Sequence, residues 1–536
     1  MPGLPKICWV VVDGLPHWLV TREVLRDPAR YPMVSRIVQA GQMAELQPVS
    51  PNCQTPPSLC SLFSGTGADR HGLTGFDIPD SRDPLAKRNA FQAFAHDVPM
   101  IWDRYAAAGQ RVALCHIPYV SRERLGAALV SQTYGFVPPA IAPVTFVLKD
   151  DRECHVVPGT DLAIATHRQS DGHVSIRVTP SVSDRPSIHL KPGEWQSLSL
   201  CAGAPTLACL CTVAGTSRLH ILGSYAFSPA GQAPDRIGTR HPFVAGGLTQ
   251  IFRTGGFGRS LIDGGAGQAE EVFFQGVRAL SKRYWAEAIL AAAADTADLT
   301  LCYQPAYDLL FHEILGLVDP DNGHATPART QVAERLLSAA LADIDCGLAA
   351  LVRAARGRPV VMCSDHGMKP VDTILCPNVL LQDWGYLQTD AGQIDAGASQ
   401  AFFHPAETGA VWFAKTLPFS AQKAILDRLA GTFSKRTGRV SHWFAAQLPT
   451  GGPDDFTRHL FFAPGKGQTL KAHVDGPATR PSRKTADHAT YSDEESLLGV
   501  VASVTHPIVL PNRIATQDVA QTFVQGFGAE AANVTS

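Results

Sequence analysis

ICWVVVDG, residues 7–14, is the stretch that decides the fold. Its first six residues are apolar without interruption and rich in valine, which is typical of a strand buried on both faces of a parallel sheet. Asp13 follows the strand and precedes Gly14. Because ligands of open α/β sheets bind beyond the carboxyl ends of strands, Asp13 is a candidate ligand or catalytic group. The alternative is a turn aspartate that precedes a glycine.

The same alternation of apolar strands and amphipathic helices continues along the chain. Further buried strands are predicted at 111–115, 298–303 and 359–364. Helices are predicted at 101–108, at 277–293, from Thr326-Pro327 to Gly357, and at 494–504. This rhythm predicts an α/β fold with a mostly parallel sheet sandwiched by helices.

One segment of the chain departs from this rhythm. From about 144 to 242 short alternating strands are separated by Pro and Gly, which indicates a β-rich insertion. We therefore expect a discontinuous α/β catalytic domain of residues 1–140 and 270–530, and a β-rich insertion or cap of residues 141–269. The glycine-rich run 254–267 lacks the strand-GxGxxG-helix context of a phosphate-binding loop, and it predicts a flexible rim or lid instead.

The overall composition excludes several classes of partner. Lys and Arg number 46 against 48 Asp and Glu, so no broad basic face for a nucleic acid polymer or an acidic membrane is expected. No segment has the uninterrupted apolar length of a membrane span, and the N-terminus lacks the pattern of a signal peptide. The 12 cysteines form no CxxC pair, which favours a reducing, cytoplasmic location.

A second stretch, NCQTPPSLCSLFSG at 52–65, predicts a short helix with a reactive end. Thr55 is expected as the N-cap, Pro56 as the first helical residue, and Gly65 as the residue just past the end. The positive end of the helix and its free backbone N–H groups would favour an anion at Thr55. Thr55 is therefore either a nucleophile that faces a phosphate-like group or a purely structural cap.

Three further sites carry side chains that suit a metal ion. Asp308 and His312 are four residues apart, so they share one face of a helical turn and could bind one zinc ion; a surface ion pair or a cap is the alternative. Asp365 and His366 follow the strand at 359–364, which repeats the placement of Asp13. His488 lies in a polar stretch and, taken alone, is expected to be merely an exposed histidine.

Taken in order, these motifs resemble the alkaline phosphatase superfamily. The similarity is strongest to its nucleotide pyrophosphatase/phosphodiesterase branch, which also holds phosphonoacetate hydrolase. The matching stretches are VVVDG (10–14), TPPSLCSLFSG followed by RHG (55–72), DLLFH (308–312), SDHGM (364–368) and DHATY (487–491). The resemblance implies an alkaline-phosphatase-like sheet, with only the insertion outside the match.

The resemblance also implies two divalent metal ions, usually zinc. One would be held by Asp13, Thr55, Asp365 and His366, and the other by Asp308, His312 and His488. Thr55 would attack phosphorus to give a covalent phosphothreonine, which water then hydrolyses. The implied function is a phosphodiesterase or nucleotide pyrophosphatase acting on a small-molecule phosphoester or phosphonate. A phosphonate C–P hydrolase, a phosphoryl transferase and a non-catalytic metal-bound binding module stay open, and the sequence does not indicate the oligomeric state.

The chain departs from the pattern of this family in two places. His488 precedes Ala489, where the family commonly has glycine. The family often places an asparagine, which donates to a phosphoryl oxygen, where this chain has Phe76 and Asp77. Either Arg70, Asn52 or a backbone N–H supplies the donor, or the substrate differs from an ordinary nucleotide diester. Cys53 does not match the sulfatase signature Cys-x-Pro-x-Arg, because its proline comes one place late and the arginine is missing.

Overall fold

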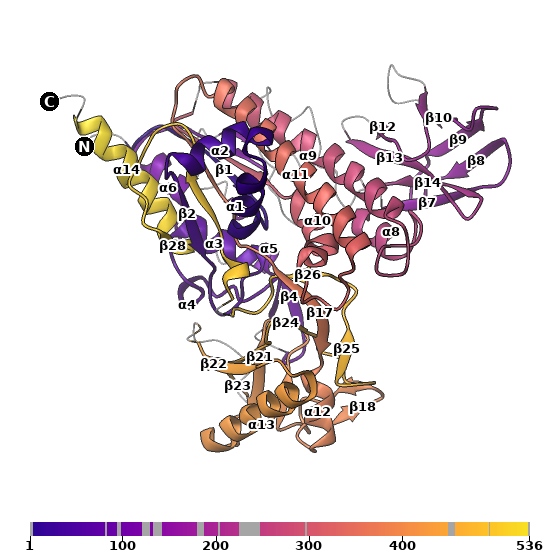
Figure 1. Ribbon diagram of the computed structural model, residues 1–536. Coiled ribbons are helices and arrows are strands. Elements are labelled where there is room, and N and C mark those ends of the chain that lie inside the picture. Colours follow the sequence, from indigo (N-terminus) through magenta and orange to yellow (C-terminus); the bar gives the residue numbers. More distant parts are fainter. Residues whose placement is uncertain are drawn as a thin grey trace.

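The computed structural model describes residues 4–80, 83–93, 98–120, 129–131, 142–179, 187–201, 204–223, 247–294, 297–446, 448, 456–492 and 494–533. Its centre is an eight-stranded sheet in the order β28-β2-β27-β16-β1-β15-β5-β6 (Figure 1). The strands are β1 (Ile7–Val12), β2 (Met43–Gln47), β5 (Val112–Cys115), β6 (Leu129–Ser131), β15 (Leu299–Gln304), β16 (Val360–Cys363), β27 (Gly499–Ser503) and β28 (Arg513–Ala515).

The sheet is mostly parallel, as predicted. β1 lies between β15 and β16 and is parallel to both, and β5 and β6 continue the parallel run. β27 is antiparallel to both of its neighbours. The predicted helix at 494–504 is therefore wrong: its apolar run Gly499–Ser503 forms this strand, and only Glu495–Leu497 forms a helical turn. A short apolar run fits a buried strand as well as a buried helix, and here Gly499 and two valines favour the strand.

Both faces of the sheet are covered by helices. Every residue of β1 is at most 2% exposed; Cys8, Val10 and Val12 face one core, while Trp9 and Val11 face the other. The first core is closed by α1 (His17–Arg26), α2 (Pro32–Gln39), α9 (Gln268–Ala293), α10 (Ala306–Ile314) and α11 (Pro327–Ala354). The second is closed by α3 (Thr55–Ser64), α6 (Ile101–Ala107) and α14 (Val519–Asn533). The predicted α/β class and the sandwich of helices are thus confirmed, although α9 begins at Gln268 and not at Val277.

The segment predicted to be β-rich forms two four-stranded antiparallel sheets with a core of their own. One contains β8 (Arg152–Val156), β9 (Ala163–Arg168), β10 (Val174–Thr179) and β11 (Ile188–Leu190), and the other β7 (Val144–Leu148), β12 (Trp195–Cys201), β13 (Ala204–Val213) and β14 (Thr216–Ile221). In Figure 1 these sheets lie beside the helical layer. The Trp195 indole donates to the backbone carbonyl of Val272 in α9, 2.9 Å away, and this contact ties the sheets to that layer. The proposed domain boundaries stay a prediction.

A further unit projects from the body of the molecule (Figure 1), and the predicted domain boundaries do not separate it from the α/β domain. This distal lobe, residues 371–481, has its own hydrophobic core. It holds α12 (Pro377–Asp383), α13 (Phe419–Thr437) and the sheet of β20 (Ala401–Phe403), β21 (Ala410–Ala414), β22 (His442–Ala445) and β23 (Phe456–Ala463). β17 (Lys369–Leu375) enters the lobe, and β26 (Ala486–Asp487) pairs with β17 on the way back.

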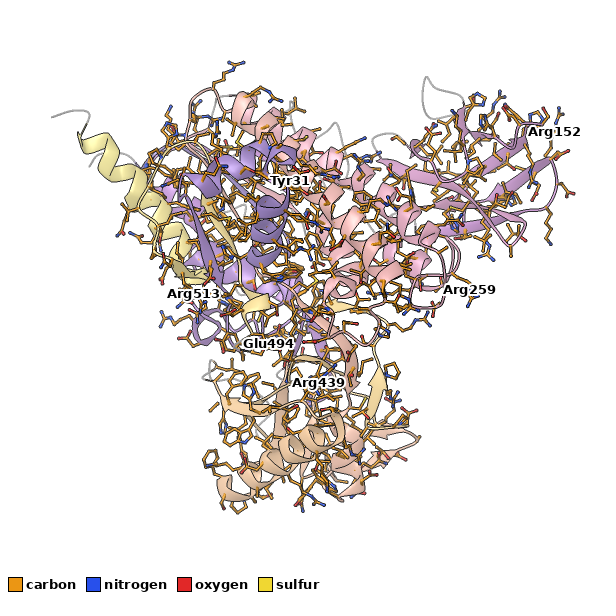
Figure 2. The ribbon with its side chains drawn as sticks, in the orientation of Figure 1. Tyr31, Arg152, Arg259, Arg439, Glu494 and Arg513 are labelled. Carbon is orange, nitrogen blue, oxygen red and sulfur yellow. The ribbon has the colours of Figure 1, made fainter. Side chains whose placement is uncertain are left out.

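Two ion pairs lie where the distal lobe meets the body of the molecule, one within the lobe and one just outside it. Arg439 pairs with Asp372, and the buried Lys369 amine donates to Glu494, 3.1 Å away. Figure 2 shows Arg439 and Glu494 at the junction of the two parts. No helix in the described part of the chain is long and apolar enough to cross a membrane.

Candidate metal centre

The parallel strands bring the predicted ligands to one edge of the sheet. Asp13 follows β1, and Asp365 and His366 follow β16. Asp308 and His312 lie on α10, which begins two residues after β15. Because β15, β1 and β16 are adjacent and parallel, their carboxyl ends meet at the same place. Thr55 from the start of α3 and His488 from the end of β26 complete the group.

The first half of the site gathers around the imidazole of His366. Its Nε2 lies 3.4 Å from Asp13 Oδ1 and 3.3 Å from Asp365 Oδ2. The hydroxyl of Thr55 is 3.4 Å from the same nitrogen. All four side chains are buried. These are the four residues that the resemblance assigns to one metal ion.

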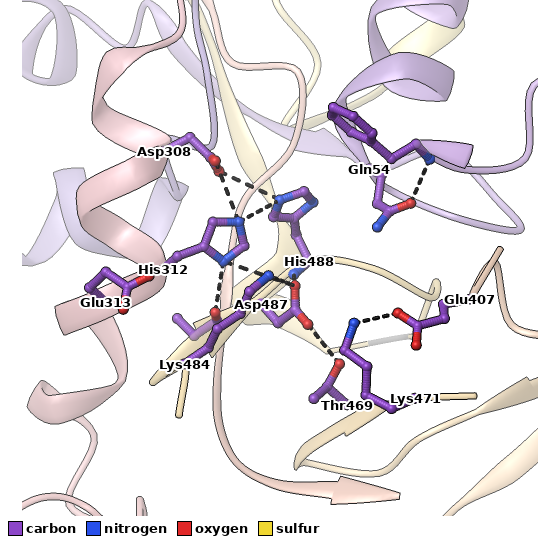
Figure 3. Close-up of polar contacts among 12 residues, drawn as sticks. Gln54, Asp308, His312, Glu313, Glu407, Thr469, Lys471, Lys484, Asp487 and His488 are labelled. Atoms are coloured by element: carbon purple, nitrogen blue, oxygen red, sulfur yellow. Dashed lines mark hydrogen bonds and ion pairs between the residues drawn. The ribbon is translucent and has the colours of Figure 1, made fainter. Parts of the chain in front are cut away.

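The second half gathers around His488. Its Nε2 lies 3.1 Å from His312 Nε2 and 3.5 Å from Asp308 Oδ1, and Asp308 Oδ2 is 3.4 Å from His312 Nε2 (Figure 3). The rings of His488 and His366 stack at 3.8 Å, so the two halves are in contact. The structure therefore brings all seven predicted site residues together.

The donor atoms of this cluster fit divalent cations. Asp13 Oδ1, Asp308 Oδ1 and Asp365 Oδ2 are buried oxygens without a hydrogen-bond partner in the described chain. Buried carboxylate oxygens are costly unless they are paired or bind a metal ion. Three overlapping sets of donors in the described residues could each hold an ion: Asp13-Asp365-His366, Asp308-His366-His488 and His312-Asp487-His488. Carboxylate and imidazole donors suit zinc.

Hydrogen bonds to backbone carbonyls orient two of the three imidazoles. His312 Nδ1 is 2.9 Å from the carbonyl of Ala486, and His366 Nδ1 is 2.9 Å from that of Gly367. A carbonyl only accepts, so each Nδ1 carries the proton and each Nε2 presents a lone pair to the site. Metal-binding histidines are commonly held in this way. The two Nε2 atoms of His312 and His488 face each other, an arrangement that a cation between them would stabilise.

The electrostatics of the site point to the same conclusion. Burial raises the pKa of Asp13 and Asp308 well above the usual range, and the neighbouring carboxylates Asp365 and Asp13, respectively, raise it further. Burial, together with the charge of Asp308, raises the pKa of Asp365 to about 7. Burial also lowers the pKa of His312 to about 3. Since a bound cation favours ionised carboxylates and neutral imidazoles, metal binding would relieve the crowding of carboxylates.

Several supporting residues could not be recognised from the sequence. The hydroxyl of Tyr303 donates to Asp13 Oδ2 across the β1–β15 pair, where Tyr303 is the register partner of Val11. Asp487 accepts the hydroxyl of Thr469 at 2.6 Å and the backbone N–H of His488 at 3.0 Å. The contact of Tyr303 with Asp13 depends on strand register, and the contact of Thr469 with Asp487 depends on how the distal lobe packs. A local sequence pattern reveals neither.

Gly14 is required by the close approach of two chain segments. Its φ of 66° lies in the left-handed region, and a Cβ built there would meet Asp308 Oδ1 at 2.8 Å. The Gly14 N–H donates to Asp365 Oδ1 at 3.1 Å. Gly14, which looks like part of a simple turn in the sequence, thus makes room for the Asp308 carboxylate and orients that of Asp365.

The loop that carries Thr55 corrects the sequence prediction in two ways. The helix forms and ends at Gly65, whose φ is 70°, as predicted, but its N-cap is Gln54, and Thr55 is the first helical residue. Pro56 and Pro57 have no N–H, so the first turn offers fewer backbone donors to an anion than expected. Residues 51–53 pair with 489–491 through Cys53 N to Ala489 O and Tyr491 N to Pro51 O. This pairing ties the loop that precedes Thr55 to the segment that follows His488.

No family model matches the sequence, and no curated protein matches it. Among solved structures, the chain is similar to phosphonoacetate hydrolase from Sinorhizobium meliloti 1021 in complex with phosphonoacetate, with a TM-score of 0.47 and 14% identity over 98% of this chain and 96% of that chain. It is also similar to human ectonucleotide pyrophosphatase/phosphodiesterase 5, with a TM-score of 0.45 and 11% identity over 98% and 95%. Both proteins are members of the superfamily that the sequence motifs resemble.

Proposed function

We propose that the chain is a two-metal phosphoric-ester hydrolase of the alkaline phosphatase superfamily that acts through Thr55. The observation that carries the proposal is a buried cluster of three orphaned carboxylate oxygens and three imidazoles at the carboxyl edge of a parallel sheet, with the Thr55 hydroxyl 3.4 Å from His366 Nε2. A threonine whose only role is to begin a helix does not need carboxylates and imidazoles nearby. A buried cluster of this composition is typical of a hydrolytic metal site.

The proposed ligand sets follow the two halves of the site. Asp13, Thr55, Asp365 and His366 would hold one ion, and Asp308, His312 and His488 the other. Bound zinc ions would supply Lewis acidity to the phosphoryl oxygens and lower the pKa of the reacting hydroxyl and water. The Nδ1 contacts of His312 and His366 keep their Nε2 atoms available to the ions.

The chain itself supplies the nucleophile. In the proposed reaction Thr55 Oγ1 forms a bond to phosphorus, and the bond from phosphorus to the leaving oxygen breaks. The Thr55 hydroxyl loses its proton, and the leaving oxygen gains one and departs as an alcohol. Water then forms the new P–O bond and the P–Oγ1 bond breaks, which restores Thr55. The positive end of α3, which begins at Thr55, would stabilise a phosphoryl group that Thr55 attacks. A cytoplasmic location and a small-molecule phosphoester or phosphonate substrate stay predictions.

Metal analysis combined with a substrate panel tests this function. Zinc-loaded protein is assayed with bis-p-nitrophenyl phosphate, p-nitrophenyl phosphate and phosphonoacetate, and its metal content is measured. The proposal predicts about two ions per chain and turnover of a phosphoric ester. Turnover of phosphonoacetate alone would indicate a phosphonate C–P hydrolase. Two bound ions without turnover of any of the three would favour a binding module.

A further inference from the structure

The phosphoryl group that Thr55 would attack needs hydrogen-bond donors, and the backbone around Thr55 supplies few. The N–H of Gln54 donates to Asn52 Oδ1 at 2.8 Å, and the N–H of Ser58 donates to the carbonyl of Gln54 at 3.2 Å. Pro56 and Pro57 have none. The N–H of Thr55 is therefore the one backbone donor that this first turn leaves for an anion.

Two side chains that the sequence suggested as donors are unsuited to the role. Asn52 is fully buried; its Oδ1 accepts from Gln54, and its Nδ2 donates to the carbonyl of Thr408 at 3.3 Å. Arg70 is exposed and lies on α4 (Ala68–His71), which follows the far end of α3. Asn52 thus fixes the loop that precedes Thr55, and Arg70 lies at the wrong end of the helix.

Gln54, the neighbour of Thr55, has a donor that is held in place and unused. Its Oε1 accepts the backbone N–H of Phe76 at 2.7 Å. Since an N–H donates only to an acceptor, this contact determines which end of the amide is oxygen and which is NH2. The loop packs tightly there, because a Cβ on Gly75 would meet Gln54 Oε1 at 3.0 Å and Thr408 Cγ2 at 2.7 Å. Within the described residues, Nε2 of Gln54 has no hydrogen-bond partner.

The unused NH2 group faces the metal centre. Figure 3 shows the Gln54 amide with its oxygen toward Phe76 and its nitrogen turned toward the side on which His488 and Lys471 lie. The side chain is partly exposed, so the nitrogen can reach a bound ligand. A preorganised amide donor of this kind stabilises charge that develops on an oxyanion.

We propose that Gln54 Nε2 donates a hydrogen bond to a non-bridging oxygen of the phosphoryl group that Thr55 attacks. The inference rests on the proposed function, and it assigns Gln54 as a catalytic residue. The Phe76 backbone N–H orients the amide, so Phe76 contributes through its main chain and not through its ring. The recognised ligand is a tetrahedral phosphorus oxyanion with at least one unesterified oxygen.

Two variants separate donation to the ligand from support of the loop. Gln54→Glu keeps the oxygen that accepts from Phe76 and replaces the NH2 group with a second oxygen, whereas Gln54→Met removes both functions at nearly constant shape. Gln47→Glu adds the same charge at an exposed position and is the control. Inorganic phosphate is titrated calorimetrically into each zinc-loaded protein, and metal content and melting temperature are measured alongside.

The proposal predicts that Gln54→Met weakens phosphate binding about ten-fold and that Gln54→Glu weakens it further, with metal content unchanged and Gln47→Glu like the wild type. Wild-type affinity in Gln54→Glu would overturn it and would leave Gln54 a structural role. Absence of phosphate binding by the wild type would also overturn it. If the wild type binds phosphate but hydrolyses no ester, the proposed function fails, while the comparison of variants still decides the role of Gln54.

Discussion

Removal of the Tyr303 hydroxyl should weaken the first metal site without touching a ligand. Tyr303 is 1% exposed, and its hydroxyl donates to Oδ2 of Asp13, whose other oxygen has no hydrogen-bond partner among the described residues. In Tyr303→Phe the carboxylate loses the donor that orients it. Loss of such an outer partner typically costs about 10- to 100-fold in metal affinity, or about 1.4 to 2.7 kcal/mol.

The assay is a zinc titration in competition with a chelator of known affinity. Tyr307→Phe is the matched control, because Tyr307 is also buried but its hydroxyl accepts from Ser281 and contacts no carboxylate in the site. We expect one of the two zinc affinities to fall in Tyr303→Phe and both to stay at the wild-type value in Tyr307→Phe. Equal zinc affinities in wild type and Tyr303→Phe, or an equal loss in both variants, would refute the role assigned to Tyr303.

Two further changes probe the second ion and the lobe. His488→Ala should leave about one ion per chain, because it removes a ligand of the second set; two ions, measured by elemental analysis, would remove His488 from the ligands. Burial opposes ionisation of Asp372, but hydrogen bonds led by that from Arg439 lower its pKa to about 2. This carboxylate therefore stabilises the fold above the unfolded pKa of 3.8, and the contribution is lost as the pH falls toward 2. Asp372→Asn should cost about 1 to 2 kcal/mol in the free energy of unfolding at pH 7, after allowance for solvent screening; a difference from wild type that persists unchanged in urea titrations near pH 2 would contradict this origin.

Much of the central sheet and its ligand positions could be predicted, because both depend on local pattern. An apolar run such as 7–12 signals a buried strand, and a carboxylate directly after it falls at the ligand edge whatever the rest of the chain does. Asp13, Asp365 and His366 are positioned in this way. Asp308 and His312 needed only helical spacing to share a face.

The remaining features depend on contacts between distant segments. The contact of Tyr303 with Asp13 follows from strand register, and that of Gln54 with Phe76 from a loop that returns after α3 and α4. Thr55 has the composition of an N-cap, yet the helix begins one residue earlier, since the loop is held by residues 489–491. The strand Gly499–Ser503 shows the same limit, because a short apolar run does not distinguish a buried strand from a buried helix.

The central claim is that Thr55 is the nucleophile of a two-metal site, and Thr55→Ala tests it most directly. The decisive measurement is the steady-state turnover of a phosphoric ester by the zinc-loaded variant. The control is Thr522→Ala, at a half-buried threonine on α14 whose hydroxyl donates to the Asp518 carbonyl. The account predicts a loss on the order of 10³-fold or more, with metal content largely retained because the other ligands still hold both ions. Turnover near the wild-type rate in Thr55→Ala would contradict it.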